Sequence, residues 1–188
     1  ITHLLIRTLE LHDKSKFDIF AYNLSEIKDD YTIRVKKAVS VFRDISNLSE
    51  LEIVKVARND QLDIAIDLNG LTKNNRISIF SYRVAPIQIN YLGYAGSLGS
   101  NSFDYILADK VLIPENQKQF YSEKIIYMPH SYQPNDNKII IPELNTTKSE
   151  HNLPDDGDKT GQKLEIEVFP EPEPEPEPEP AREPDPEP

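Results

Sequence analysis

The sequence contains no cysteine and no tryptophan, and it has only one methionine. Without cysteine the chain has neither disulfides nor thiolate metal ligands. No apolar run approaches the ~20 residues that a membrane-spanning helix needs. Basic residues are not in excess either, since 21 Lys and Arg stand against 32 Asp and Glu. These absences predict a cytoplasmic protein with no membrane segment and no affinity for nucleic-acid phosphates.

The acidic character is concentrated at one end of the chain. From residue 170 to 188, nine of the nineteen residues are proline and eight are Asp or Glu. Proline at every second position is incompatible with helix and sheet hydrogen bonding, and the like charges repel one another. We therefore expect a disordered Pro/Glu-rich tail at 170–188. A polar linker at 144–169 precedes it, with one strand-like stretch at 164–169.

The first 143 residues alternate between helix and strand patterns. Helices are expected at 2–11, 31–40, 49–58 and 76–83, and strands at 17–23, 41–44, 62–68, 87–92, 105–108 and 124–128. This alternation predicts βαβ units and a mostly parallel sheet. The predicted fold class is therefore α/β, with a Rossmann-like domain over residues 1–143. Its first helix pattern has no strand before it, which indicates a fragment.

The segment 85–99 carries the strongest functional signal. It reads Ala-Pro-Ile-Gln-Ile-Asn-Tyr-Leu-Gly-Tyr-Ala-Gly-Ser-Leu-Gly, a β-prone stretch that runs straight into a glycine-rich loop. Gly93, Gly96 and Gly99 allow the backbone to approach another group closely. Because ligands of open α/β sheets bind beyond the carboxyl ends of the strands, we expect this loop to line a ligand site.

This segment resembles the catalytic region of protein O-GlcNAc transferases, including their bacterial relatives and the plant SPINDLY-type proteins. Further matching motifs, in the same order along the chain, lie at 17–22, 67–73, 104–109, 121–124 and 128–136. The resemblance implies the N-terminal one of two Rossmann-like catalytic halves. It also implies transfer of GlcNAc from UDP-GlcNAc to Ser or Thr of acceptor proteins, with inversion and with no metal or other cofactor.

Two candidate residues follow from the resemblance. Asp60 matches an aspartate proposed to assist proton movement from the acceptor hydroxyl, and His130 lies where a strand ends on the cleft side. The residues alone leave simpler interpretations open: a solvated turn aspartate, and a buried imidazole bonded to backbone. The family's His-Pro pair falls ahead of Ile1, so His3 is not that histidine.

Leu92, Gly93 and Tyr94 match the family segment that lines the sugar pocket. There the family usually has Gly-Tyr-Pro-Gly, whereas this chain has Ala95 in place of the proline. Losing the proline removes a restraint on φ, which predicts a more mobile loop.

The resemblance also implies that the cationic groups stabilising the UDP diphosphate belong to the other half. We therefore expect the chain to be inactive alone. A rival hypothesis is a non-catalytic protein-binding module with an acidic spacer tail. Calorimetry with UDP separates the two, since tight binding favours the transferase.

Overall fold

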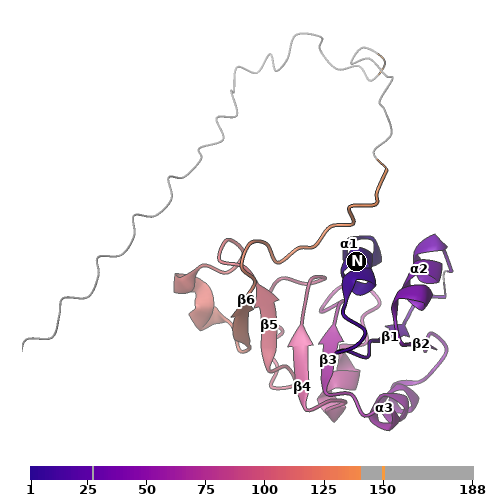
Figure 1. Cartoon of the computed structure of the whole chain (residues 1–188). Helices are drawn as coiled ribbons and strands as arrows, with labels where there is room; N and C mark the ends of the chain where they lie inside the picture. Colours follow the sequence, from indigo (N-terminus) through magenta and orange to yellow (C-terminus); the bar gives the residue numbers. More distant parts are fainter. Residues whose placement is uncertain (27, 141–149, 151–188) are drawn as a thin grey trace, which may run out of the picture. The chain divides into compact units, whose positions relative to one another are not determined.

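The computed structural model describes residues 1–26, 28–140 and 150 of the chain (Figure 1). The tail expected at 170–188 lies outside the described residues, as does the linker expected at 144–169 apart from Glu150. Of the domain expected over residues 1–143, the last three residues are also outside them. The sections below concern Ile1–Ile140, which form one unit.

Every strand pair in the described part of the chain is parallel. β1 (Phe20–Asn23) pairs with β2 (Val41–Asp44), and a second sheet has the order β3-β4-β5-β6. The bounds of its strands are β3 (Ile64–Asp67), β4 (Ile87–Asn90), β5 (Tyr105–Ala108) and β6 (Lys124–Tyr127). The predicted α/β class with parallel pairing is thus confirmed, as two ladders of two and four strands.

Three α-helices connect or cover these strands: α1 (Thr2–Leu11), α2 (Asp30–Ala38) and α3 (Glu50–Asn59). α2 begins where the Asp29 carboxylate accepts the Thr32 N–H at 2.8 Å, and α3 begins where the Glu52 carboxylate accepts the Ser49 N–H at 2.8 Å. Both arrangements satisfy N–H groups that the first turn of a helix leaves unpaired. Figure 1 shows the β1–β2 pair between α2 and α3.

Some predicted elements need correction. Residues 76–83 were expected to form a helix, and the helix that forms there is the shorter 3₁₀ helix η1 (Ile77–Tyr82). The segment stops at Arg83, whose φ of 52° is left-handed, just ahead of the proline that opens β4. Such a short stretch favours the tighter 3₁₀ winding. A second 3₁₀ helix, η2 (Glu115–Phe120), was not anticipated, and the strands expected at 17–23, 62–68, 87–92 and 124–128 are shorter than their apolar patterns.

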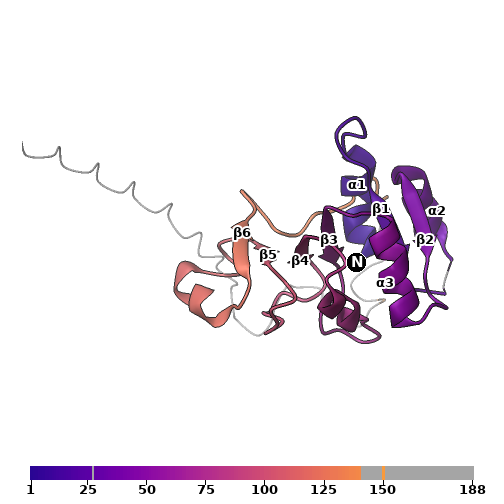
Figure 2. The ribbon, with the colours of Figure 1, turned by 90° about the horizontal axis from the view of Figure 1, so that it is seen from below.

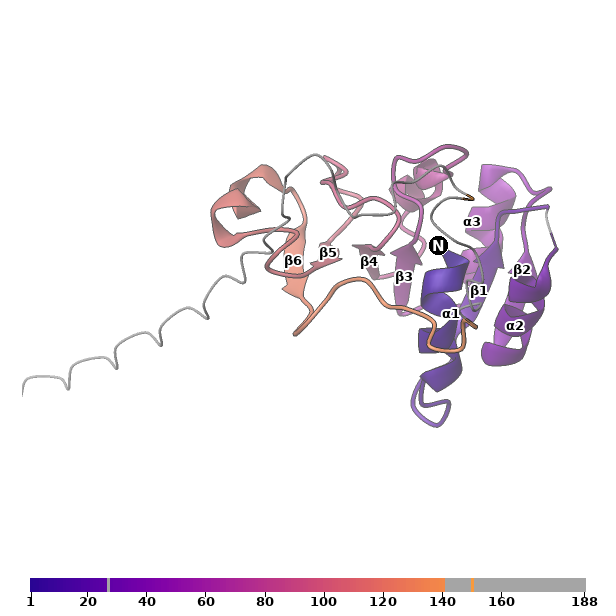
Figure 3. The same cartoon turned by 90° about the horizontal axis from the view of Figure 1, so that it is seen from above.

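Apolar side chains pack on both sides of the strands. One cluster joins α3, β3 and η1 and includes Val54, Ala65 and Phe80. Another joins α1 and α2 to the β1–β2 pair and includes Ile6 and Val35. In the view from above, α3 lies on one side of β1, and α1 and α2 lie on the other side (Figure 3). Helices on both faces of parallel strands are the arrangement of doubly wound α/β proteins.

No helix in the described part of the chain is long and apolar enough to cross a membrane.

Candidate functional site

The carboxyl ends of β3 and β4 carry buried polar residues at matched positions. The register pairs Asp67 with Asn90, the last residues of the two strands. The Asp67 carboxylate accepts the N–H groups of Asn69 at 3.0 Å and Gly70 at 2.9 Å, which holds the loop after β3 in a tight turn. Burial raises the pKa of Asp67, and these two hydrogen bonds oppose the rise.

Asn90 holds the glycine loop after β4. Its Nδ2 donates to the carbonyl oxygens of Tyr94 and Gly96, each at 3.2 Å. Tyr121 adds a third restraint by donating its hydroxyl to the Ala95 carbonyl at 3.3 Å. The structure therefore places side-chain hydrogen bonds on all three residues around the position where the family has proline. The Oδ1 atom of Asn90 is buried and has no hydrogen-bond partner within the described part of the chain.

The glycines of the two loops are required by close contacts. A Cβ atom on Gly93 would lie 2.0 Å from the Leu68 carbonyl oxygen, and one on Gly70 would lie 2.3 Å from the Tyr94 Cβ. Real Cβ atoms do not approach other atoms so closely, because van der Waals repulsion forbids it. The close backbone approach predicted from the sequence is present, and it is made between the loops after β3 and β4.

Free N–H groups line part of this loop. The Gly93 N–H donates to the Tyr91 carbonyl at 2.9 Å, whereas those of Tyr94, Ala95 and Gly96 make no hydrogen bond to any described residue. Successive unpaired backbone donors in a partly exposed loop form a polar surface for hydroxyl or phosphate oxygens.

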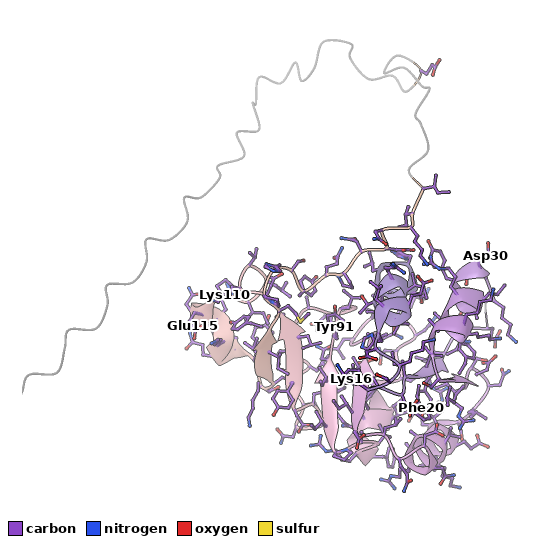
Figure 4. All side chains as sticks on the ribbon, viewed as in Figure 1. Lys16, Phe20, Asp30, Tyr91, Lys110 and Glu115 are labelled. Carbon is purple, nitrogen blue, oxygen red and sulfur yellow. The ribbon has the colours of Figure 1, made fainter. Side chains whose placement is uncertain are left out.

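Leu92 differs from its neighbours. It has a positive φ of 71° and its side chain is buried with Leu5 of α1 and with Tyr91. Its side chain is therefore part of the core, so any contact with a ligand falls to the backbone. Figure 4 shows Tyr91 at the end of the β4 arrow, next to α1.

His130 lies at the same edge of the sheet. It follows β6, is exposed, and makes no hydrogen bond within the described residues. Two residues later the chain is fixed: Tyr132 donates its N–H to Asp109 at 2.9 Å and accepts the Tyr91 hydroxyl at 2.7 Å. The interpretation of His130 as a buried structural imidazole is therefore wrong. His130 is exposed to solvent shortly after the end of β6.

Asp60 lies at the opposite end of the sheet. It caps α3 just before β3 begins, whereas the glycine loop follows the end of the parallel strand β4. The carboxylate forms an ion pair with Arg43 at 2.6 Å and accepts the Tyr22 hydroxyl at 2.6 Å. Its side chain is only 7% exposed, so the interpretation as a solvated turn residue is wrong.

The environment of Asp60 makes it a weak base. Hydrogen bonding to the Arg43 guanidinium is the largest effect that lowers the pKa of Asp60, and the Tyr22 hydroxyl lowers it further. A carboxylate stabilised in this way takes up a proton less readily. The structure thus brings the glycine loop and the His130 segment to one edge and leaves Asp60 at the other.

Sequence reasoning did not single out Asp67 and Asn90. Each is the last residue of its strand, which reads Ile-Ala-Ile-Asp in β3 and Ile-Gln-Ile-Asn in β4, and an Asn-Gly or Leu-Gly pair follows shortly after. Because parallel strands end at a common edge, that repeated pattern was the available signal.

A hollow is also present at the other end of the sheet, away from this edge. A shallow hollow of about 410 Å³ lies at the amino ends of β3 and β4, lined by residues that include Arg58, Asp63 and Arg83. The turns before β3 and β4 form the floor of this hollow. Because it lies away from the glycine loop, the size of a hollow alone does not identify the site. Among the described residues, no group of three or more His, Asp and Glu side chains is placed to hold a metal ion.

A parallel α/β sheet that gathers glycine turns and buried polar groups at its carboxyl edge is typical of proteins that bind nucleotides and their conjugates. The comparison with known families is more specific. The model of glycosyl transferase family 41 matches residues 1–169, and the chain belongs to that family.

The relatives are peptide N-acetylglucosaminyltransferases. The chain is 32% identical over 162 residues to the probable UDP-N-acetylglucosamine–peptide N-acetylglucosaminyltransferase SEC of Arabidopsis thaliana, covering 83% of this chain and 17% of that protein. It is 32% identical over 160 residues to the Caenorhabditis elegans enzyme, covering 78% of this chain and 14% of that protein. The structure resembles a lysine-to-methionine mutant of the Thermobaculum terrenum O-GlcNAc transferase, with a TM-score of 0.67 and 27% identity over 70% of this chain and 25% of the other. The chain therefore spans only a minor part of these relatives.

Proposed function

We propose that residues 1–140 form one wall of the catalytic crevice of a UDP-GlcNAc-dependent protein glycosyltransferase. In this proposal they are the N-terminal, Rossmann-like half, and the glycine loop after β4 lies against the GlcNAc moiety of the donor. The acceptor is a Ser or Thr hydroxyl of a protein. Membership of glycosyl transferase family 41 supports the reaction class.

The observation that carries the proposal is the loop itself. Its N–H groups at Tyr94 and Gly96 are unpaired within the described residues, and Asn90 fixes the carbonyl groups of the same two residues. Fixed donors suit a sugar. When the sugar hydroxyls give up their bound water, they can form hydrogen bonds to backbone N–H groups that are already in place, so the loop does not have to reorganise. The close contact at Gly93 keeps any side chain out of the way at that point.

The two remaining candidate residues, His130 and Asp60, relate differently to the proposal. His130 projects from the same edge and is free to contact the donor or acceptor. The transfer forms a bond between the hydroxyl oxygen and the sugar C1 as UDP leaves, so the hydroxyl must lose a proton. Asp60 lies at the opposite end of the sheet from the glycine loop and is paired with Arg43, so its part in proton movement stays a prediction.

A chimaeric enzyme tests the function. Residues 1–140 would replace the matching region of the C. elegans relative, and transfer from labelled UDP-GlcNAc to a peptide would be measured. We expect GlcNAc transfer, and Gly93→Ala in the same chimaera should reduce it. A chimaera that folds and binds UDP but transfers no sugar would contradict the proposal.

The chain by itself provides a second test. We expect no turnover of UDP-GlcNAc, because the proposed crevice has only one of its walls here. Robust transfer by the purified chain would contradict the one-wall proposal while leaving the reaction class intact.

A further inference from the structure

The segment before β6 holds the glycine loop from a second side. It contains Tyr121, Ser122 and Glu123, which belong to the sequence motif at 121–124 and lie between η2 and β6. In the sheet, β5 lies between β4 and β6 (Figure 2). The loop that follows β4 therefore reaches past β5 to meet this segment.

Glu123 makes the shortest contacts with the loop. Its Oε1 accepts the Leu98 N–H at 2.7 Å, and its Oε2 accepts the Ser97 hydroxyl at 2.7 Å. The Ser122 hydroxyl also donates to Oε2, at 3.1 Å. Both carboxylate oxygens are thus occupied, and two of the three donors belong to the glycine loop.

Ser97 extends this restraint to the end of the loop. While its hydroxyl donates to Glu123, the same oxygen accepts the N–H of Gly99 at 3.2 Å and that of Ser122 at 3.3 Å. Gly99 has a positive φ of 60°, which glycine adopts without strain. The end of the glycine loop is thus closed into a turn around one hydroxyl group.

The Glu123 carboxylate is buried without a cation. The residue is 4% exposed and forms no ion pair with any described residue, whereas the buried Asp136 pairs with Arg34 at 2.6 Å. Removing a carboxylate from water is costly, and hydrogen bonds to the ionised group offset that cost. Because apolar residues can replace buried polar groups with little loss, stability alone does not account for a carboxylate here.

The residues held in this way surround the free donors of the loop. Asn90 and Tyr121 fix the carbonyl groups of residues 94–96, and Glu123 fixes residues 97 and 98. The N–H groups of Tyr94 and Gly96 therefore lie in a stretch where every residue is bonded to a side chain.

We propose that Glu123 is a positioning residue for the donor sugar. Through Ser97 and Leu98 it sets the direction of the glycine-loop N–H groups. It does not itself contact substrate, because both of its oxygens are already bonded within the protein. The inference rests on the proposed function, in which those N–H groups face the GlcNAc moiety.

Kinetics of the chimaeric transferase test this role. Glu123→Gln keeps the shape of the side chain and can still accept the Leu98 N–H, but its NH₂ group cannot accept the Ser97 hydroxyl. We expect kcat/KM for UDP-GlcNAc to fall about tenfold, because the donors facing the sugar are misplaced. The Kd for UDP, measured by calorimetry, should stay within about twofold, since UDP lacks the sugar.

A double variant shows whether the effect passes through one hydrogen bond. Ser97→Ala removes the donor of that bond and should cause a similar loss of kcat/KM. Because both changes break the same bond, the double variant should lose no more than either single variant. Val35→Ala is the control for a general loss of stability. It removes packing from a cluster that contains no residue of the glycine loop, and kcat/KM should stay within about twofold.

Hydrogen exchange in the full chain tests the restraint without an assay of transfer. Glu123→Leu leaves the Leu98 N–H without its acceptor, so that amide should exchange about tenfold faster. The Ile45 amide, which bonds to Asn23 beyond the other strand pair, should change little.

The outcomes separate this inference from the proposed function. A folded parent chimaera that transfers no sugar would contradict the proposed function, and the role of Glu123 towards the sugar with it. With an active parent, unchanged kcat/KM in the Glu123→Gln chimaera would overturn the positioning role alone. So would additive losses in the double variant, an equal loss of UDP affinity, or unchanged Leu98 exchange in a folded Glu123→Leu chain.

Discussion

The two ends of β3 and β4 are built from different kinds of interaction. At the carboxyl ends, Asp67 and Asn90 are buried and bond to loop backbone, and glycines let the two loops touch. At the amino ends, charged side chains form ion pairs whose arginines are partly exposed, as in Arg43–Asp60 and Arg83–Asp104. The first arrangement fixes backbone donors in place, whereas the second fastens elements together. We therefore expect the binding site at the carboxyl end.

The largest expected effect is on the contact between the two loops. Gly93→Ala places a methyl group 2.0 Å from the Leu68 carbonyl, an atom of the backbone that has little room to move. Overpacking of this kind lowers the free energy of unfolding by about 1–3 kcal/mol. Urea denaturation followed by circular dichroism would measure it.

Gly96→Ala is the matched control for that variant. Its added methyl group would meet the outer part of the Tyr94 ring at 2.9 Å, and a ring can turn aside. We expect a smaller loss of stability. Equal losses at the two glycines would show that the Leu68 contact is not the constraint.

The next effect concerns the amide that holds the glycine loop. Asn90→Leu removes both hydrogen bonds to the loop carbonyls and leaves them unsatisfied, a cost of about 1–3 kcal/mol in unfolding free energy. The amides of Gly93 and Leu98, which are hydrogen-bonded at either end of the loop, should also exchange faster with solvent. A variant as stable as the parent, with unchanged exchange, would remove Asn90 from the account of the site.

Gly93 and Asn90 show how far the sequence could predict the structure. α1, β2 and β5 have the predicted bounds, because their apolar patterns are clear and their ends are local. The sequence predicted a close backbone approach at the glycine loop, but it did not predict that the loop after β3 would be the partner. The partners of Asp60 were not predictable, since Tyr22 and Arg43 lie 38 and 17 residues away along the chain. Asn90 was expected to lie inside a strand over 87–92, whereas β4 ends at Asn90.

Lowering the pH should change the stability contributed by the two ends in opposite directions. The pKa values of Asp60 and Asp104 are lowered, chiefly by hydrogen bonds to Arg43 and Arg83. The stability that they contribute is present above the ordinary value of 3.8 and is lost as pH falls through their lower folded values. Burial raises the pKa of Asp67, so its charged carboxylate lowers the stability of the fold at neutral pH. This loss of stability is relieved as pH falls towards 3.8.

Unfolding measured between neutral pH and pH 3 separates these contributions. Asp104→Asn should flatten the loss of stability at acid pH, whereas Asp67→Asn should make that loss steeper between neutral pH and about 3.8. If both variants shift the acid profile in the same direction, the two ends do not differ in the way described.

The smallest expected effect is at an ion pair of the amino end. Arg83→Met removes the pair with Asp104, in which the arginine side chain is 45% exposed. Exposed pairs contribute about 0–1 kcal/mol, and salt screens them. The difference from the parent chain should shrink further as sodium chloride is added. A larger, salt-insensitive loss would mean that the amino end is packed as rigidly as the carboxyl end.

Steady-state kinetics of the chimaeric transferase test the central claim most directly. The same chimaera would carry either Gly93→Ala at the carboxyl end or Arg83→Met at the amino end, with both proteins confirmed as folded at the assay temperature. The account predicts that kcat/KM for UDP-GlcNAc falls by about tenfold or more in the first and stays within about twofold in the second. Equal losses, or a loss confined to the Arg83 variant, would contradict it.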